Sequence, residues 1–195
     1  MTFFSDPNPP GDITMKNATT NSIFVKWTPA LFMENSDGFN YTVNISNSSG
    51  TTDYSTKALN QTLTNLTSGT PHVICVRTTG PLGLQSESVC SGNIITKPHP
   101  IRNLTAETLN TTAIELKWDR PEDYQSTYRY QVQISGCTSP SRDASTSEEK
   151  IIISSLPPGT NCTFIIYVEV MNGTRGEELK ISHYTSKIFL TKFLL

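Results

Sequence analysis

Four cysteines and three histidines are the residues of this 195-residue chain best suited to covalent or metal chemistry. The cysteines lack the C-x-x-C spacing of a common zinc site, and the histidines are scattered. The chain contains neither the G-x-S-x-G turn of a serine nucleophile nor the G-x-x-x-x-G-K loop that binds phosphates. We therefore expect a non-catalytic chain that needs no metal or other cofactor.

Asparagine offers a second kind of chemistry, because N-x-S/T with x not proline is the acceptor for N-linked glycans. Serine and threonine fill 49 of the 195 positions, so chance places a hydroxyl two residues after roughly a quarter of the 14 asparagines. The number of acceptors is ten, which favours the secretory pathway over accidental matches in a hydroxyl-rich protein. They are Asn17, Asn40, Asn44, Asn47, Asn60, Asn65, Asn103, Asn110, Asn161 and Asn172.

The overall charge excludes one large class of partners. The chain has 15 Lys and Arg against 17 Asp and Glu, a formal net charge of -2 and a pI near 5.9. A nucleic-acid binder needs a positive field, and none is present. With 35% hydrophobic and 16% charged residues and a mean hydropathy of -0.30, the chain is expected to fold.

The two ends suggest that the chain is part of a longer protein. Residues 1–10 have no basic segment followed by an apolar core, so they do not form a signal peptide. The apolar residues 188–195 are too few to span a bilayer, which needs about 20 residues. We expect the leader and the anchor of an extracellular protein to lie outside this sequence.

An internal repeat divides the chain into two similar halves. Three landmarks return after 89 to 91 residues: Ile23–Trp27 as 114–118, Tyr41–Ile45 as 130–134, and Leu66–Thr70 as 156–160. A short connector with two prolines, at 96–100, joins the halves. We expect an N-terminal tail, two domains and a C-terminal tail with the boundaries 1–6, 7–97, 98–187 and 188–195.

Each landmark alternates apolar and polar residues, which predicts half-buried β-strands. Ile23, Val25 and Trp27 share one face of their strand, and no segment has a convincing helical period. Short strands separated by Gly, Pro, Asn and Ser clusters favour an all-β sandwich. We expect Trp27 and Trp118 to lie at the centres of two small cores.

The pattern resembles the fibronectin type III domain. The resemblance rests on a proline before the first strand (Pro10, Pro100), the I/L-x-V/L-x-W and Y-x-V-x-I strands, and L-x-x-G-T before a late strand. It implies two tandem seven-stranded immunoglobulin-like sandwiches that serve as spacers or docking modules. One departure is that the tyrosine expected two residues after Gly-Thr is His72 in the first copy and Cys162 in the second.

The two cysteines of the first copy fit a hairpin between residues 71–79 and 86–95. If Thr79 faces Ser86, Cys75 and Cys90 lie directly opposite each other on the outer face of the sheet, within disulfide reach. We predict a disulfide there. The rival interpretation is a cytosolic protein with four free thiols, which the density of glycan acceptors disfavours.

The cysteines of the second copy are assigned from the resemblance. The family fold pairs the third and sixth strands, which brings Cys137 beside Cys162. Cys137 falls on the outer face by strict alternation, and a bulge at Gly136 could turn it toward its partner.

The dense acceptors, tandem repeats and strand-linking cysteines look most like the extracellular repeats of receptor-type protein tyrosine phosphatases. That resemblance implies an extracellular, cell-surface segment whose partners are a protein ligand or a neighbouring receptor. A cytokine-receptor ligand-binding module is one alternative, although the W-S-x-W-S motif is missing. A secreted matrix or adhesion fragment is another.

Two loops of the second copy could contact a partner. Tyr124, Tyr128 and Arg129 form the best candidate for an aromatic and cationic patch that no glycan shields, with a place in the core as the alternative for Tyr128. The sequence Arg175-Gly176-Glu177 resembles the Arg-Gly-Asp tripeptide of integrin ligands. Its third residue is one methylene too long, so we favour an ordinary turn.

Overall fold

The computed structural model describes residues 5–33, 38–47, 50–138 and 140–187, and it divides into two compact units, Met1–Lys97 and Pro98–Leu195. We refer to them as domain 1 and domain 2. The expected C-terminal tail at 188–195 and the first four residues of the N-terminal tail lie outside the described residues. Among the described residues there is no helix long and apolar enough to cross a bilayer.

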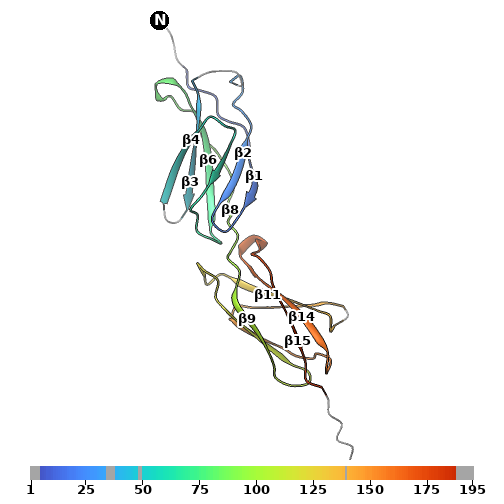
Figure 1. Cartoon of the computed structure of the whole chain (residues 1–195). Helices are drawn as coiled ribbons and strands as arrows, with labels where there is room; N and C mark the ends of the chain where they lie inside the picture. The colour runs from blue at the N-terminus through green and yellow to red at the C-terminus, as the bar shows by residue number, and fades with distance from the viewer. Residues whose placement is uncertain (1–4, 34–37, 48–49, 139, 188–195) are drawn as a thin grey trace, which may run out of the picture. The chain divides into compact units, whose positions relative to one another are not determined.

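Domain 1 consists of two antiparallel sheets (Figure 1). The first sheet has the order β1-β2-β5, with strands at Ile13–Ala18, Ile23–Trp27 and Asn60–Leu63. The second has the order β4-β3-β6-β7, and β8 also pairs with β6; these strands are Gly50–Thr56, Asn40–Asn47, Pro71–Thr79, Val89–Cys90 and Ile94–Ile95. A single 3-10 turn, Pro81–Gly83, follows β6.

Domain 2 repeats this plan (Figure 1). Its first sheet has the order β13-β10-β9, with strands at Lys150–Ile153, Ile114–Asp119 and Arg102–Thr108. Its second sheet has the order β12-β11-β14-β15, with strands at Arg142–Thr146, Arg129–Ser135, Asn161–Glu169 and Leu179–Tyr184. The expected class, two tandem all-β immunoglobulin-like sandwiches, is confirmed.

The inward residues of the alternating strands form the core of each domain. On β2, Ile23, Val25 and Trp27 are buried, while Phe24 and Lys26 between them are not. Each tryptophan meets the tyrosine of the facing strand edge to face, at 5.6 Å for Trp27 and Tyr41 and 5.2 Å for Trp118 and Tyr130. The same local pattern therefore builds the same aromatic centre twice.

Candidate functional surfaces

No cluster of side chains that could bind a metal ion is found in the part of the chain that the structure describes. Within it, no three His, Cys, Asp or Glu side chains lie close enough together to hold a metal ion. His72 is buried in β6, His183 lies in β15, and the Nε2 atom of His99 is 4.0 Å from a carboxylate oxygen of Asp123. The three histidines therefore lie on different segments, each with different neighbours.

Cys75 on β6 and Cys90 on β7 form a disulfide, with their Cα atoms 4.0 Å apart. Their neighbours Ile74 and Val76 are fully buried, so the cysteines lie on the opposite, outer face of the sheet. This bond joins the pair that the hairpin register predicts. The bond joins β7, a strand of only two residues, to β6, which is an inner strand of the larger sheet.

The register at the turn differs from the prediction, however. Thr79 faces Gln85, and the expected pairing of Thr79 with Ser86 is wrong. Ser86 faces Thr78: its N–H donates to the Thr78 carbonyl at 2.9 Å, and its Oγ accepts the Thr78 N–H at 2.9 Å. One extra residue then lies between Ser86 and Val89, and this bulge brings Cys75 opposite Cys90.

A second serine interrupts the last strand of domain 1, which we expected to be continuous from 86 to 95. Ser91 donates its N–H to the Ile74 carbonyl at 2.7 Å, and its Oγ accepts the Ile74 N–H at 3.1 Å. The strand is therefore divided into β7 and β8. The serine hydroxyls satisfy the amides that an unbroken ladder would have paired.

In domain 2 the disulfide joins Cys137, just after β11, to Cys162 on β14, with the Cα atoms 4.8 Å apart. Gly136 has a φ of +80°, and an added Cβ would stand 3.5 Å from the Asn161 carbonyl oxygen. This left-handed residue follows Ser135, the last paired residue of β11, and turns Cys137 inward, where both cysteines are buried. The second bridge thus lies at the core, whereas the first lies on the surface.

The turn before β6 is fastened by a buried histidine in place of the family's tyrosine. The His72 ring is fully buried, and its Nε2 lies 2.9 Å from the Thr70 hydroxyl. That hydroxyl donates to the Thr67 carbonyl at 2.7 Å, so Nε2 carries the proton and donates to it. Burial lowers the pKa of His72, and only the nearby Thr67 carbonyl favours the charged ring.

A buried threonine completes the same turn in each domain, and sequence reasoning missed both. The Thr96 hydroxyl donates to the Thr67 carbonyl at 2.7 Å and accepts the Thr70 N–H at 3.2 Å. Thr185 donates to the Pro157 carbonyl at 2.6 Å and accepts the N–H of Thr160 at 3.0 Å. Their spacing of 89 residues, the offset of the repeat itself, was the signal available in the sequence.

The glycan acceptors lie mostly at exposed positions. Both sheets of domain 1 carry them: Asn17 and Asn60 are on the smaller sheet and half-buried Asn40 and Asn44 on the larger. The exposed acceptors are Asn17, Asn60, Asn65, Asn103, Asn110 and Asn161. The side chains of Asn47 and Asn172 lie outside the described residues.

The patch proposed on domain 2 needs a correction. Tyr128 is fully buried beneath Tyr124, with their ring centres 5.8 Å apart, so it supports the patch but cannot contact a partner. The Arg120 guanidinium covers the Tyr124 ring at 4.3 Å and donates to Glu149 at 2.5 Å. The sequence had not singled out Arg120.

The turn with the Arg-Gly-Glu sequence is tied to its own sheet. The Arg175 guanidinium lies 4.8 Å from the centre of the Tyr167 ring, and its Nε is 3.5 Å from the Glu169 carboxylate. This arrangement covers Tyr167, which is buried although it lies on the outer face. A folded-back arginine of this kind fits the ordinary turn that we favoured.

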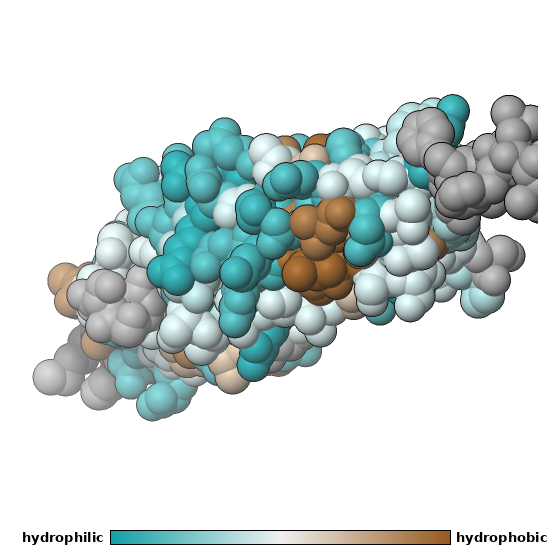
Figure 2. All heavy atoms as spheres, turned by 90° about the horizontal axis from the view of Figure 1, so that it is seen from below, coloured by the Kyte–Doolittle hydropathy of each residue, from teal (hydrophilic) through white to brown (hydrophobic). Residues whose placement is uncertain are grey.

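Hydrophilic and weakly polar residues cover most of the face in Figure 2, where a compact strongly hydrophobic cluster lies near the middle and smaller hydrophobic groups lie toward the margins. Large exposed hydrophobic side chains occur on both domains, among them Phe32 and Leu82 on domain 1 and Met171 on domain 2. Scattered exposure of this kind is usual on soluble domains.

Comparisons with known proteins agree with the geometry. The sequence is 31% identical over 183 residues to human receptor-type tyrosine-protein phosphatase H, covering 90% of this chain and 16% of that protein. It is 24% identical over 186 residues to chicken receptor-type tyrosine-protein phosphatase eta, covering 95% of this chain and 13% of that protein. The chain thus spans about a sixth or less of these relatives.

A solved two-domain fibronectin type III segment of chicken tenascin has a similar structure, with a TM-score of 0.65 at 14% identity. The match covers 91% of this chain and all of the tenascin segment. The sequence pattern of the fibronectin type III domain matches residues 8–89 and 99–184. The chain therefore belongs to the fibronectin type III family, of which it contains two tandem domains.

Proposed function

We propose that this chain is a non-catalytic, N-glycosylated spacer and recognition segment from the extracellular part of a receptor-type tyrosine phosphatase. The observation that carries the proposal is the similarity to two such receptors along nearly the whole chain. The two disulfides support an oxidising compartment, because cytosolic thiols are kept reduced. The ten acceptor sequences point to the same compartment.

The spacer role is supported by the way each domain is built. Each has its own buried tryptophan, its own disulfide and its own threonine-fastened turn. A module with a complete core can be repeated along an ectodomain without depending on its neighbours. In this proposal, catalysis belongs to a different part of a longer protein.

The recognition role is assigned to the surface of domain 2 around Tyr124 and Arg129, with Arg120 as an added member. Tyr124 is half-buried and Arg129 is exposed, and aromatic and arginine side chains often anchor protein interfaces. Cells that bind a multimeric, fluorescent form of the unaltered chain are the assay. Arg129→Glu should abolish this binding. Lys180→Glu is the matched control, because Lys180 is also an exposed cation, on β15.

The receptor assignment is tested by reading the transcript beyond both ends of this sequence. We expect a secretory leader upstream, and a membrane span followed by a phosphatase domain downstream. A reading frame that continues into a secreted protein with no anchor would favour the matrix fragment and contradict the receptor assignment.

A further inference from the structure

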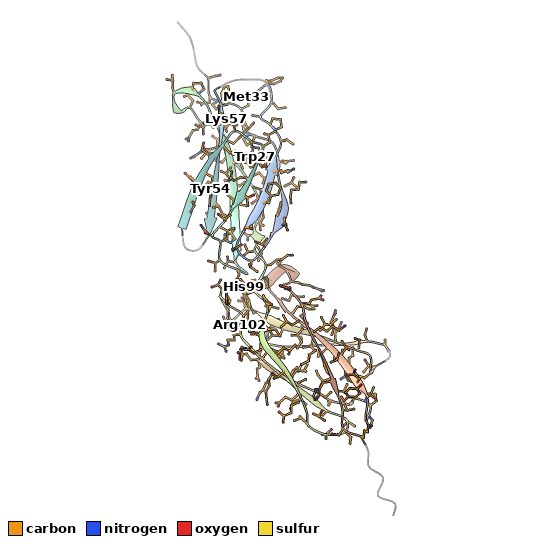
Figure 3. The ribbon with its side chains drawn as sticks, in the orientation of Figure 1. Trp27, Met33, Tyr54, Lys57, His99 and Arg102 are labelled. Atoms are coloured by element: carbon orange, nitrogen blue, oxygen red, sulfur yellow. A yellow bond between two sulfur atoms is a disulfide. The ribbon has the colours of Figure 1, made fainter. Side chains whose placement is uncertain are left out.

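One edge of domain 1 is open between its two sheets. A groove of about 350 Å³ lies there, within the range of small-ligand sites. It is lined by residues of β3, β4 and the turn after β5, including Ile45, Thr52, Tyr54 and Leu66. Tyr54 lies on the edge strand β4, as Figure 3 shows, and packs against the core.

Domain 2 closes the same edge with its own side chains. Arg142 pairs with Ile134 as Thr52 pairs with Ile45, so these two residues are equivalent. The Arg142 guanidinium donates to the Ser154 carbonyl at 2.8 Å and so spans the gap between β12 and the turn after β13. The short Thr52 side chain cannot reach that far, which explains the groove.

The leucine beneath this edge is buried to a different extent in the two domains. In domain 2 Leu156 is only 2% exposed, whereas its counterpart Leu66 in domain 1 is left partly exposed. Domain 1 therefore has apolar surface at this edge that its own side chains do not cover.

Domain 1 and domain 2 also differ at two more equivalent positions around the groove. Asn65 has a φ of +60° and its counterpart Ser155 a φ of +59°, so the turns match, but only Asn65 begins a glycan acceptor, Asn65-Leu66-Thr67. Tyr54 pairs with Val43 as Ala144 pairs with Val132, so the aromatic ring is also confined to domain 1. The acceptor and the ring thus occur on the domain that lacks the bridging arginine.

We propose that the first sugars of an N-glycan on Asn65 fill this groove and close the edge of domain 1. Asn65 is exposed and itself lines the groove, so a sugar on its Nδ2 atom starts at the groove wall. The apolar face of a pyranose ring can stack on Tyr54. The hydroxyls of Thr51, Thr52 and Tyr54 make no side-chain hydrogen bond to other described residues and can bind the sugar hydroxyls.

The inference rests on the proposed extracellular function, because it requires N-glycosylation. It is tested on the whole chain, secreted from a glycosylating host. Thr67→Ala removes the acceptor and leaves Asn65 in its left-handed turn, where another residue would add strain. Thr67→Ser, which keeps the acceptor, is the matched control.

The first readout is thermal unfolding. In a Trp118→Phe background, the fluorescence of Trp27 reports domain 1 alone. We expect Thr67→Ala to lower the midpoint of domain 1 by about 2–5 °C, and Thr67→Ser to leave it nearly unchanged. Combined with Tyr54→Thr, the effect of Thr67→Ala should largely disappear, because the glycan has lost its contact.

The second readout is direct. Magnetisation transfer in NMR spectra should link the ring protons of Tyr54 to the first N-acetylglucosamine of the Asn65 glycan. An occupied Asn65 without this contact, or with purely additive effects of the two variants, overturns the groove proposal and leaves the proposed function intact. A chain that carries glycans elsewhere but never on Asn65 also overturns it, and a chain with no glycan at all overturns both.

Discussion

At the scale of single residues, small buried polar groups hold the turn before the sixth strand of each domain. His72 and Thr96 do this in domain 1, and Thr185 does it in domain 2. The threonine hydroxyls satisfy backbone groups that the turn buries, and the His72 imidazole donates to the Thr70 hydroxyl, which itself binds the Thr67 carbonyl. An unsatisfied buried group costs about 1–3 kcal/mol. The turn is therefore sensitive both to the loss of a hydroxyl and to the charge of the ring.

The stability of domain 1 should depend on pH through His72. Its pKa is lowered from 6.5 by burial, so the unfolded state binds the proton more readily than the folded state. Stability is then complete above about pH 6.5 and falls as the pH drops below that value. Urea midpoints at pH 7.5, 6.5 and 5.5, followed by Trp27 fluorescence in the Trp118→Phe background, measure the effect.

His72→Gln should flatten this acid dependence, whereas His183→Gln, in the other domain, should leave it in place. If domain 1 loses stability equally in acid with and without His72, the buried ring is not the group responsible.

Removing the bridging hydroxyls should destabilise each domain separately. Thr96→Val and Thr185→Val keep the shape of the side chain, and we expect each to lower the free energy of unfolding of its own domain by about 1–3 kcal/mol. Denaturant titrations with Trp27 and Trp118 as separate reporters distinguish the domains. Thr127→Val, at an exposed loop position, is the control and should change little.

At the scale of elements, the alternation of side chains determined most of what could be predicted. It specified the strands and their inward faces. The pairing of Cys75 with Cys90 is confirmed, although it was derived from a turn register that is wrong by one residue. The alternation could not specify the bulge that follows Ser86, because a serine that satisfies the amide of Thr78 has the same pattern as one in a regular strand. It also failed for Tyr128, whose place under Tyr124 is set by a loop that has no period.

The two disulfides should differ in importance. Loop-entropy estimates give about 3 kcal/mol for the separation of 15 residues and about 3.5 kcal/mol for the separation of 25. The inner bridge also fills part of the core, so Cys137→Ala with Cys162→Ala should cost more than Cys75→Ala with Cys90→Ala. Guanidinium unfolding of the two double variants measures this, and an equal or reversed order would contradict the placement of the bridges.

Two glycines lie close in sequence to disulfide cysteines, Gly136 and Gly92. Of these, Gly136 should tolerate an added side chain less well. Its φ of +80° is unfavourable for alanine by about 1–2 kcal/mol, while the added methyl group would make only ordinary van der Waals contact with the Asn161 carbonyl oxygen. Gly136→Ala should therefore destabilise domain 2. Gly92→Ala in domain 1 is the control, because an added Cβ there meets nothing within 4 Å. If the two variants lower the thermal midpoint of their own domains by equal amounts, the assigned turn is contradicted.

At the scale of the whole molecule, the chain is a pair of fibronectin type III domains that resist unfolding by separate means and present acceptor asparagines at many exposed positions. Among the described residues, no group of His, Cys, Asp or Glu side chains could hold a metal ion. This construction suits a segment that occupies space and offers surfaces outside the cell.

The most direct test is the intact mass of the chain secreted from a glycosylating host, measured without reduction, before and after an endoglycosidase. We predict a loss of mass equal to at least three glycans, no thiol that reacts with an alkylating reagent, and peptides that link Cys75 to Cys90 and Cys137 to Cys162. An unchanged mass together with four reactive thiols would contradict the account.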